Sequence, residues 1–215
     1  MTRLDYITSL LKEYNTIADV GTDHGFVPIS AIKDYNLSHA YALDINDGPL
    51  LNCKQNIMFE GLMDKIDIIK SDGLKEFDKI VDAIVIAGMG GELIKKILSD
   101  SLPKALKAKA LILSPNKEED LLRKFLINNG FVIALEHIIY DHNHFYEIIK
   151  AIPGDGIIYS ELDIKYGPYL RREKSDEFIR KWTRKLHQLE LAYKNSGEEK
   201  KEMILSKINS IKEIL

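Results

Sequence analysis

Cysteine is almost absent from this sequence of 215 residues. Cys53 is the only one, so the chain cannot form a disulfide within itself. Long apolar runs are missing too: none approaches the ~18 residues of a membrane span, and the first twenty residues lack the apolar core of a signal peptide. With 45% hydrophobic and 29% charged residues, the composition is typical of a soluble globular protein. We therefore expect a cytoplasmic protein without a membrane partner.

Positive charge is scarce in most of the chain, although the net charge is only −3. Residues 165–215 contain 13 Lys and Arg against 8 Asp and Glu, a net charge of +5. Residues 1–164 contain 17 against 25, a net charge of −8. A basic segment can be an ordinary solvated helix surface, or it can hold a nucleic-acid backbone. Both interpretations remain open, but the two parts should meet different partners.

Short apolar runs alternate with stretches of helical length through most of the chain. The runs are "TIADV", "HAYALD", "IDIIKS", "AIVIAG" and "ALILS". This alternation predicts an α/β fold with a doubly wound, Rossmann-like parallel sheet, preceded by an amphipathic helix at the N-terminus. Two further runs, "GFVIALEHIIY" and "HFYEIIKAI", are separated only by "DHN". They predict an antiparallel hairpin at one edge of the sheet.

The last fifty residues contain two apolar stripes with helical spacing. The first consists of Phe178, Trp182, Leu186, Leu189 and Tyr193, and the second of Ile204, Ile208, Ile211 and Leu215. The linker "NSGEE" between them predicts an antiparallel, coiled-coil-like helical hairpin whose helices pack on each other. We therefore expect two domains, residues 1–160 with the sheet and residues 161–215 with the helices. Removal of the tail should then spare ligand binding by the first domain.

The G-x-G-x-x-G fingerprint of dinucleotide-binding proteins is also missing. In its place, after the first predicted strand, Asp19, Gly21, Asp23 and Gly25 form the pattern D-x-G-x-D-x-G. Such a turn lies at the carboxyl edge of the sheet, where ligands of α/β proteins bind. A carboxylate at Asp23 repels a phosphate but suits a ligand that bears an ammonium or sulfonium group. S-adenosylmethionine is such a ligand, and we expect all four residues to contact it.

Acidic residues also follow the second and third predicted strands. Asp44 ends the second strand, where a carboxylate can accept hydrogen bonds from both ribose hydroxyls of the cofactor. Asp72 and Gly73 follow the third, where a carboxylate can accept from the exocyclic amine of adenine. Each is also a common turn residue. In this order after successive strands they favour a methyltransferase over a dehydrogenase.

Glycines recur after the fourth predicted strand in "AGMGGEL". Gly88 there is a candidate cofactor contact, and Met89 and Gly90 are candidate catalytic residues, because the glycines let a flat base or a methyl group approach the backbone. After the fifth strand, "LSPN" places Asn116 before a predicted helix. Asn116 is a candidate substrate contact, although we favour a role as the N-cap of that helix.

The motifs "IADVGTDHGFVP", "DINDGPL", "SDGL", "AGMGGELI", "LILSPN" and "YGPYL" together resemble the bacterial tRNA (adenine(22)-N1)-methyltransferase family. The resemblance covers nearly the whole chain, and D-H-G combined with G-M-G-G is its specific part. Ser114 departs from it, since a bulkier polar residue is expected there. The resemblance implies a class I methyltransferase domain, a coiled-coil-like C-terminal domain, and tRNA as the substrate. A methyltransferase acting on another RNA or on a small substrate, and a non-catalytic nucleotide- or RNA-binding module, remain alternatives.

Methylation of an adenine ring nitrogen needs little acid–base chemistry, because its lone pair is already nucleophilic and mainly has to be aligned. An acceptor for a proton of the exocyclic amine would help, and Asp23 and His24 are the candidates. Four basic residues of the tail are candidate phosphate contacts: Arg180, Lys181, Arg184 and Lys185.

His142 and His144 are two residues apart, but no further ligand cluster accompanies them, so a hairpin turn explains them better than a metal site. We therefore expect no metal. Trp182 lies on the apolar stripe and is interpreted as packing. The oligomeric state stays open, with a monomer favoured.

Overall fold

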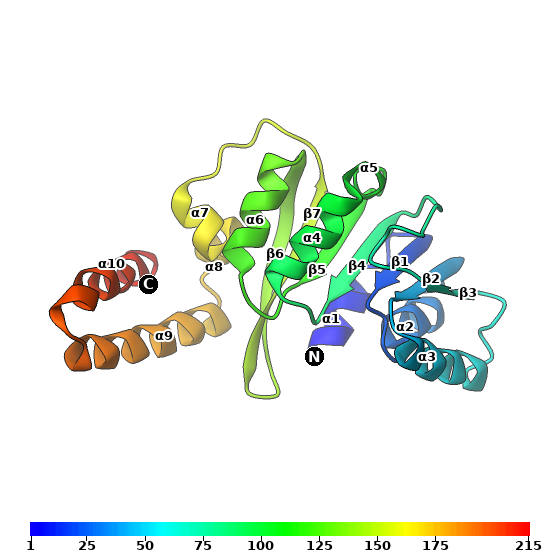
Figure 1. Ribbon diagram of the computed structural model, residues 1–215, viewed down its shortest axis with the longest axis horizontal. Coiled ribbons are helices and arrows are strands. Elements are labelled where there is room, and N and C mark those ends of the chain that lie inside the picture. Colours follow the sequence, from blue (N-terminus) through cyan, green and yellow to red (C-terminus); the bar gives the residue numbers. More distant parts are fainter.

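The computed structural model describes the backbone of residues 1–215 and every side chain except that of Glu198. Its centre is a seven-stranded sheet of order β3-β2-β1-β4-β5-β7-β6 (Figure 1). The strands are β1 (Thr16–Val20), β2 (His39–Asp44), β3 (Ile66–Lys70), β4 (Ala83–Ala87), β5 (Ala110–Ser114), β6 (Phe131–Asp141) and β7 (His144–Pro153). The helices are α1 (Arg3–Ser9), α2 (Phe26–Tyr35), α3 (Asp47–Phe59), α4 (Gly91–Asp100), α5 (Leu102–Ala105), α6 (Glu119–Asn128), α7 (Glu161–Tyr166), α8 (Pro168–Glu173), α9 (Asp176–Asn195) and α10 (Glu198–Ile214).

Strands β1 to β5 are parallel, as the alternation of runs and helices predicts. The strand order runs β1, β2, β3 toward one edge and β4, β5 toward the other, so it reverses between β1 and β4. The carboxyl ends of these two strands therefore flank the crevice in which α/β proteins bind ligands. The predicted doubly wound fold is confirmed.

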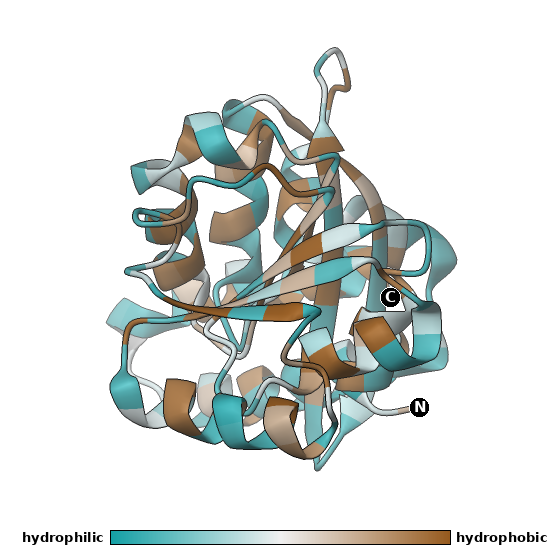
Figure 2. Cartoon of the chain, turned by 90° about the vertical axis from the view of Figure 1, so that its right-hand side faces the viewer, coloured by the Kyte–Doolittle hydropathy of each residue, from teal (hydrophilic) through white to brown (hydrophobic). Residues whose placement is uncertain are grey.

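Apolar side chains bury both faces of the sheet. One cluster packs residues such as Ile84 and Ile86 of β4 under α4 and α6, and the other packs Ile17 and Val85 under α1, α2 and α3. Figure 2 shows brown hydrophobic segments along the strands, whereas the helices carry both brown and teal segments. Burying both faces explains why the parallel strands are continuous apolar runs without alternation.

The antiparallel hairpin of β6 and β7 lies at the sheet edge, and β7 pairs with β5. Its turn is formed by His142 and Asn143, which have φ of 45° and 66°. The predicted hairpin and its histidine turn are confirmed. The tip extends beyond the rest of the sheet, between α1 and α9 (Figure 1).

The tail forms the predicted helical hairpin of α9 and α10. Its apolar residues do more than pack on each other, because Phe178 of α9 and Ile211 of α10 share a cluster with Ile138 of β6. Tyr166 and Leu170, from the short helices α7 and α8, complete this cluster. The base of the tail is therefore packed on the edge hairpin of the sheet.

Five charged side chains form a buried ion network beneath the tail. Arg123 of α6, which is fully buried, pairs with Glu136 of β6 and Glu147 of β7. Lys181 of α9 donates to Glu147 at 2.6 Å and to Glu119 at 2.9 Å. Burial alone would raise the pKa of Glu147, but the charges of Lys181 and Arg123 outweigh burial and lower it. The network thus links the tail electrostatically to the sheet.

Among the described residues, no helix is both long and apolar enough to cross a membrane.

Candidate active site

A cleft of about 480 Å³ opens at the carboxyl ends of β1, β2 and β4. We call it the carboxyl-edge cleft. Its lining comes from the turn after β1, the end of β2, the loop after β4 and the first residues of α1. Among the predicted site residues it brings together are Asp19, Gly21, Asp23, His24, Asp44, Gly88 and Met89. Four separated segments thus converge at the place that the strand order marks as the ligand crevice.

The turn after β1 is held in an unusual backbone conformation. Gly21, Asp23 and Gly25 all have positive φ, of 76°, 48° and 74°. The N–H groups of Gly21 and Thr22 both donate to the carbonyl of Leu43 on β2, at 2.8 and 3.0 Å. A Cβ on Gly25 would lie 2.7 Å from the sulfur of Cys53. The glycines therefore allow a sharp reversal that is tied to the neighbouring strand and leaves Asp23 facing outward.

Two carboxylates form the inner wall of the cleft. Asp19 is 4% exposed and Asp44 is 9% exposed. Burial raises the pKa of Asp19 to about 7, and the nearby charge of Asp44 contributes to the rise. One oxygen of Asp44 accepts from the backbone N–H of Asn46 at 2.9 Å, whereas its other oxygen has no partner among the described residues. That oxygen is an acceptor available to a ligand hydroxyl.

The loop after β4 lies directly over the turn that follows β1. A Cβ on Gly21 would come within 2.1 Å of the Met89 methyl group, so the two loops touch through this side chain. Gly90 is the N-cap residue of α4, and a Cβ there would lie 3.2 Å from Lys117. Gly88 has φ of 81°. The loop therefore closes one side of the cleft with backbone and a flexible thioether.

Asn116 holds this loop in place. Its side-chain amide donates to the carbonyl of Gly88 at 2.6 Å, and its backbone N–H donates to the carbonyl of Met89 at 2.8 Å. The expectation that Asn116 caps the following helix is wrong, because α6 has Glu118 at its N-cap position. The amide that would cap a helix is instead engaged by the loop after β4.

Arg3 is a cleft residue that the sequence did not reveal. Its guanidinium donates to Asn116 at 3.2 Å and lies over the ring of Tyr146, 4.4 Å from the centroid. Its backbone N–H donates to Asp141, which lowers the pKa of that carboxyl. A basic residue near the start of an amphipathic helix carries no motif, so only the fold places it at the cleft.

Asp23 and His24 form the outer rim. The His24 Nε2 lies 3.6 Å from a carboxylate oxygen of Asp23, and both side chains are substantially exposed. The imidazole stacks on Phe26, with 5.3 Å between ring centroids. Asn56 donates to the backbone carbonyl of His24 at 2.9 Å and fixes the turn. A titratable pair therefore lies at the mouth of the cleft.

Other predicted site residues lie outside the cleft lining. The Asp72 carboxylate pairs with Lys75 at 2.5 Å on the surface after β3. Gly73 has φ of 64°, and a Cβ there would lie 2.8 Å from Ile97. Arg180, Arg184 and Lys185 lie exposed on α9. Lys181 belongs to the buried ion network, so its ammonium already has two carboxylate partners and is not an open phosphate contact.

Among the described side chains, no group of three or more His, Cys, Asp or Glu residues is arranged to hold a metal ion.

Comparison with known proteins gives concordant matches. The family model of tRNA (adenine(22)-N(1))-methyltransferase matches residues 17–213. The tRNA (adenine(22)-N(1))-methyltransferase of Bacillus subtilis is 32% identical over 202 residues, which are 91% of this chain and 85% of that protein.

Solved structures agree over the full length, tail included. A Streptococcus pneumoniae protein in complex with S-adenosyl-L-methionine, proposed to be a tRNA (m1A22) methyltransferase, has a TM-score of 0.93, 35% identity and full coverage of both chains. The structure of M. capricolum TrmK in complex with the natural cofactor product S-adenosyl-homocysteine has a TM-score of 0.90 and 26% identity, covering 99% of this chain and 96% of that one. The chain belongs to the tRNA (adenine(22)-N(1))-methyltransferase family.

Proposed function

We propose that this protein transfers a methyl group from S-adenosylmethionine to N1 of adenine 22 in tRNA. The observation that carries the proposal is the carboxyl-edge cleft, in which Asp19, Asp23 and Asp44 converge at the crevice between β1 and β4. Family membership supports the reaction, and the similar S. pneumoniae and M. capricolum structures contain the methyl donor and its demethylated product.

The cleft residues fit this cofactor. The unpartnered oxygen of Asp44 would accept from a ribose hydroxyl, and the exposed carboxylate of Asp23 would face the methionine ammonium. Asp19, with a pKa of about 7, would be ionised more fully beside a cationic ligand. Gly21, Gly25 and Gly88 would let the ligand approach the backbone. When bound, the cofactor supplies an electrophilic methyl group on a sulfonium.

The protein's own contribution is mainly alignment of the adenine. Asn116 engages the carbonyls of both Gly88 and Met89, so it would hold the loop in one position beside the target base. Gly90 would leave room for that base. A methylated ring is cationic until the exocyclic amine loses a proton, and Asp23 or His24 at the cleft mouth would accept it. Asp72 would need to leave Lys75 to contact the cofactor.

We also propose a division of labour between residues 1–160, which bind the cofactor, and residues 161–215, which bind tRNA. The net charge of +5 in residues 165–215 supports this, since a basic surface attracts the RNA backbone. The protein would act as a monomer in the cytoplasm.

Nucleoside analysis tests the function. The protein is incubated with unmodified tRNA and methyl-labelled cofactor, and the digested tRNA is analysed by mass spectrometry. Label in N1-methyladenosine is expected. Label confined to a different nucleoside would favour the alternative of a methyltransferase with another target.

A further inference from the structure

A second hollow lies between the tip of the β6–β7 hairpin and α9. We call it the hairpin groove, and its volume is about 530 Å³. Two aromatic residues of the hairpin line one side, and a polar and basic face of α9 lines the other. The residues used below are Tyr140, Phe145, Arg180, Thr183, Arg184 and His187. The four helical residues have the spacing i, i+3, i+4, i+7 and therefore share one face.

Arginine and aromatic rings are stacked in this groove. The Arg180 guanidinium lies 4.7 Å from the ring centroid of Tyr140 and 5.9 Å from that of Phe145. Tyr140 and Phe145 are opposite each other in the hairpin, with 4.7 Å between their centroids. Unpaired RNA bases stack on aromatic rings and on guanidinium planes. The groove thus offers the two kinds of surface that a base uses.

The groove is also open to anions. None of its lining residues is acidic, and neither Arg180 nor Arg184 forms an ion pair with a described carboxylate. Lys181, one residue after Arg180, has its ammonium engaged by Glu119 and Glu147. α9 therefore uses one face to attach to the sheet and leaves another face with two uncompensated guanidinium groups. Such groups suit phosphate, which an arginine can bind through two parallel hydrogen bonds.

The groove lies next to the carboxyl-edge cleft, on the other side of the same hairpin. Phe145 lines the groove, and its neighbour Tyr146 packs under Arg3, which lines the cleft. Side chains of successive strand residues point to opposite faces. An RNA strand entering the cleft over the hairpin tip, which lies between α1 and α9 in Figure 1, would reach the groove with a neighbouring nucleotide.

We propose that the hairpin groove binds an unstacked nucleotide of the tRNA substrate, with its phosphate on Arg180 and Arg184 and its base against Tyr140. This rests on the proposed function and adds a substrate site outside the cofactor cleft. Extruding a target base from a stacked region costs a few kcal/mol and leaves its neighbours without stacking partners. A stacking surface beside the cleft would compensate part of this cost.

Charge removal in the full-length chain is the first test. In R180Q/R184Q, KM for tRNA should rise about tenfold, while kcat and the dissociation constant for S-adenosylmethionine stay at wild-type values. Each phosphate that the protein no longer neutralises lowers the slope of log Kd against log salt by roughly 0.7 to 0.9, so loss of the one phosphate held by both arginines should lower the slope for tRNA binding by about that amount. Both side chains are exposed, and retained cofactor binding shows that the variant is folded.

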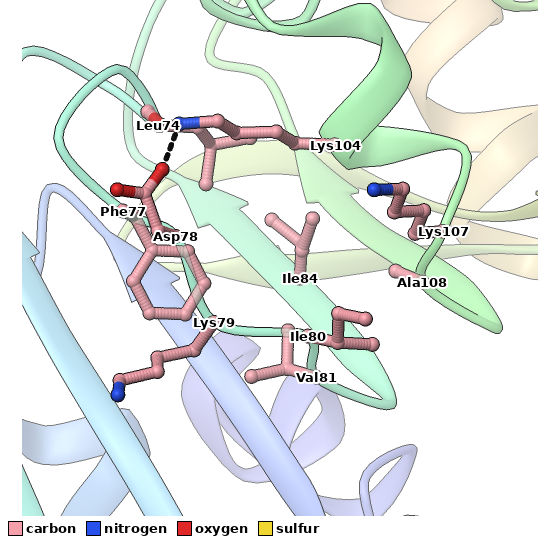
Figure 3. A pocket seen from close by; sticks show the side chains of 10 residues that line it. All are labelled: Leu74, Phe77, Asp78, Lys79, Ile80, Val81, Ile84, Lys104, Lys107 and Ala108. Carbon is pink, nitrogen blue, oxygen red and sulfur yellow. Dashed lines mark hydrogen bonds and ion pairs between the residues drawn. The ribbon is translucent and has the colours of Figure 1, made fainter.

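A charge-matched control comes from the opposite edge of the sheet. Lys79 and Lys107 line a hollow of about 120 Å³ at the amino ends of β4 and β5 (Figure 3). K79Q/K107Q removes the same charge and should leave KM and the salt slope unchanged. An equal effect of both double variants would overturn the proposal, because it would show only a general response to net charge.

Stacking is tested separately with Tyr140→Leu. This variant should raise the Kd for tRNA several-fold, as expected for one base on one ring, without changing the salt slope, because no charge is lost. Wild-type affinity for tRNA in both Y140L and R180Q/R184Q would overturn the proposal that the groove binds a nucleotide. An altered oligomeric state in R180Q/R184Q would also overturn it, because it would indicate a protein interface. The Kd for tRNA and its salt slope are measured without turnover, so they test the groove even if the wild type shows no methylation, which would be the failure of the proposed function.

Discussion

Replacing Lys181 with methionine should destabilise the whole protein, although the residue lies on the tail. The substitution keeps most of the aliphatic length and removes the ammonium that is 2.6 Å from Glu147 and 2.9 Å from Glu119. Among the described side chains, Arg123 is then the only cation paired with Glu136 and Glu147, the two most buried carboxylates of the network. The variant therefore leaves an excess negative charge in a region from which water is excluded.

The magnitude follows from the burial of the partners. Removing one member of a fully buried ion pair costs about 3–5 kcal/mol. The Lys181 side chain is 18% exposed while that of Glu147 is 1% exposed, and Arg123 still compensates part of the charge. We therefore expect a loss near the lower end, about 3 kcal/mol. Lys181→Met combined with Glu147→Gln removes the excess charge and should recover part of that loss.

Urea denaturation followed by circular dichroism measures the effect. The matched control is Arg184→Met, less than one helical turn further along α9 but exposed, which should cost less than about 0.5 kcal/mol. The pKa of Glu147 is lowered from 4.5, so its stabilisation is present above that value and lost as the pH falls through the folded pKa. The gap between wild type and Lys181→Met should therefore narrow in acid. A difference in unfolding free energy below 1 kcal/mol at pH 7, or strictly additive losses in the double variant, would show that Lys181 does not compensate the buried carboxylates.

Three further predictions concern the carboxyl-edge cleft. Asp44→Ala should weaken binding of S-adenosylmethionine by about 1–3 kcal/mol, because the ribose hydroxyls lose a hydrogen-bond acceptor. Calorimetry on the folded variant would show an unchanged Kd if Asp44 is only a turn residue. Asn116→Ala should lower kcat more than it raises the cofactor Kd, because the carbonyl of Gly88 loses its 2.6 Å partner; equal single-turnover rates would contradict this. Asp19 has a folded pKa of about 7 against an ordinary 3.8, so it binds a proton more strongly in the folded state. The free energy of unfolding of the wild type should therefore fall as the pH rises from 3.8 to about 7. Asp19→Asn should remove that fall, and parallel pH profiles of the two proteins in denaturation would argue against it.

The architecture could be predicted from the sequence because its signals are local. Apolar runs of strand length separated by helix-length stretches indicate the parallel sheet. The three residues "DHN" between the last two runs are too few for a helix, which indicates the edge hairpin. The turn at Gly21 and Gly25 is likewise readable, since both adopt the positive φ that glycine permits. In each case the residues that determine the conformation are adjacent in the chain.

Hydrogen-bond and ion-pair partners that are distant in the chain could not be predicted from the sequence. Asn116 precedes an acidic helix start, so capping was a reasonable interpretation, but its amide finds the carbonyl of Gly88, 28 residues earlier. Arg3 reaches Asn116 across 113 residues. In the sequence Lys181 looks like its basic neighbours on α9. Only the fold shows that it pairs with Glu147, which is 34 residues away. The partner of a polar side chain depends on which groups the tertiary fold brings near it, and no periodic pattern in the sequence indicates those groups.

The same limitation affects the expected independence of the tail. Deleting residues 165–215 would remove Lys181 from Glu147 and the backbone N–H of Tyr169 from Glu136, to which it donates at 3.0 Å. It would also uncover Ile138 of the third apolar cluster. Buried carboxylates without partners are costly. The structure thus gives reason to expect that truncation weakens the cofactor domain, and substitutions on the exposed face of α9 are the better probes of tRNA binding.

Methylation resolved to the single nucleotide distinguishes adenine 22 from every other target in tRNA. Two unmodified tRNA transcripts are compared under identical conditions, one with adenine at position 22 and one with guanine there. We expect stoichiometric N1-methyladenosine in the first transcript and background labelling in the second, with Asp44→Ala slowing the first reaction at limiting cofactor. Equal methylation of the two transcripts, or label at any atom other than N1 of adenine 22, would contradict it.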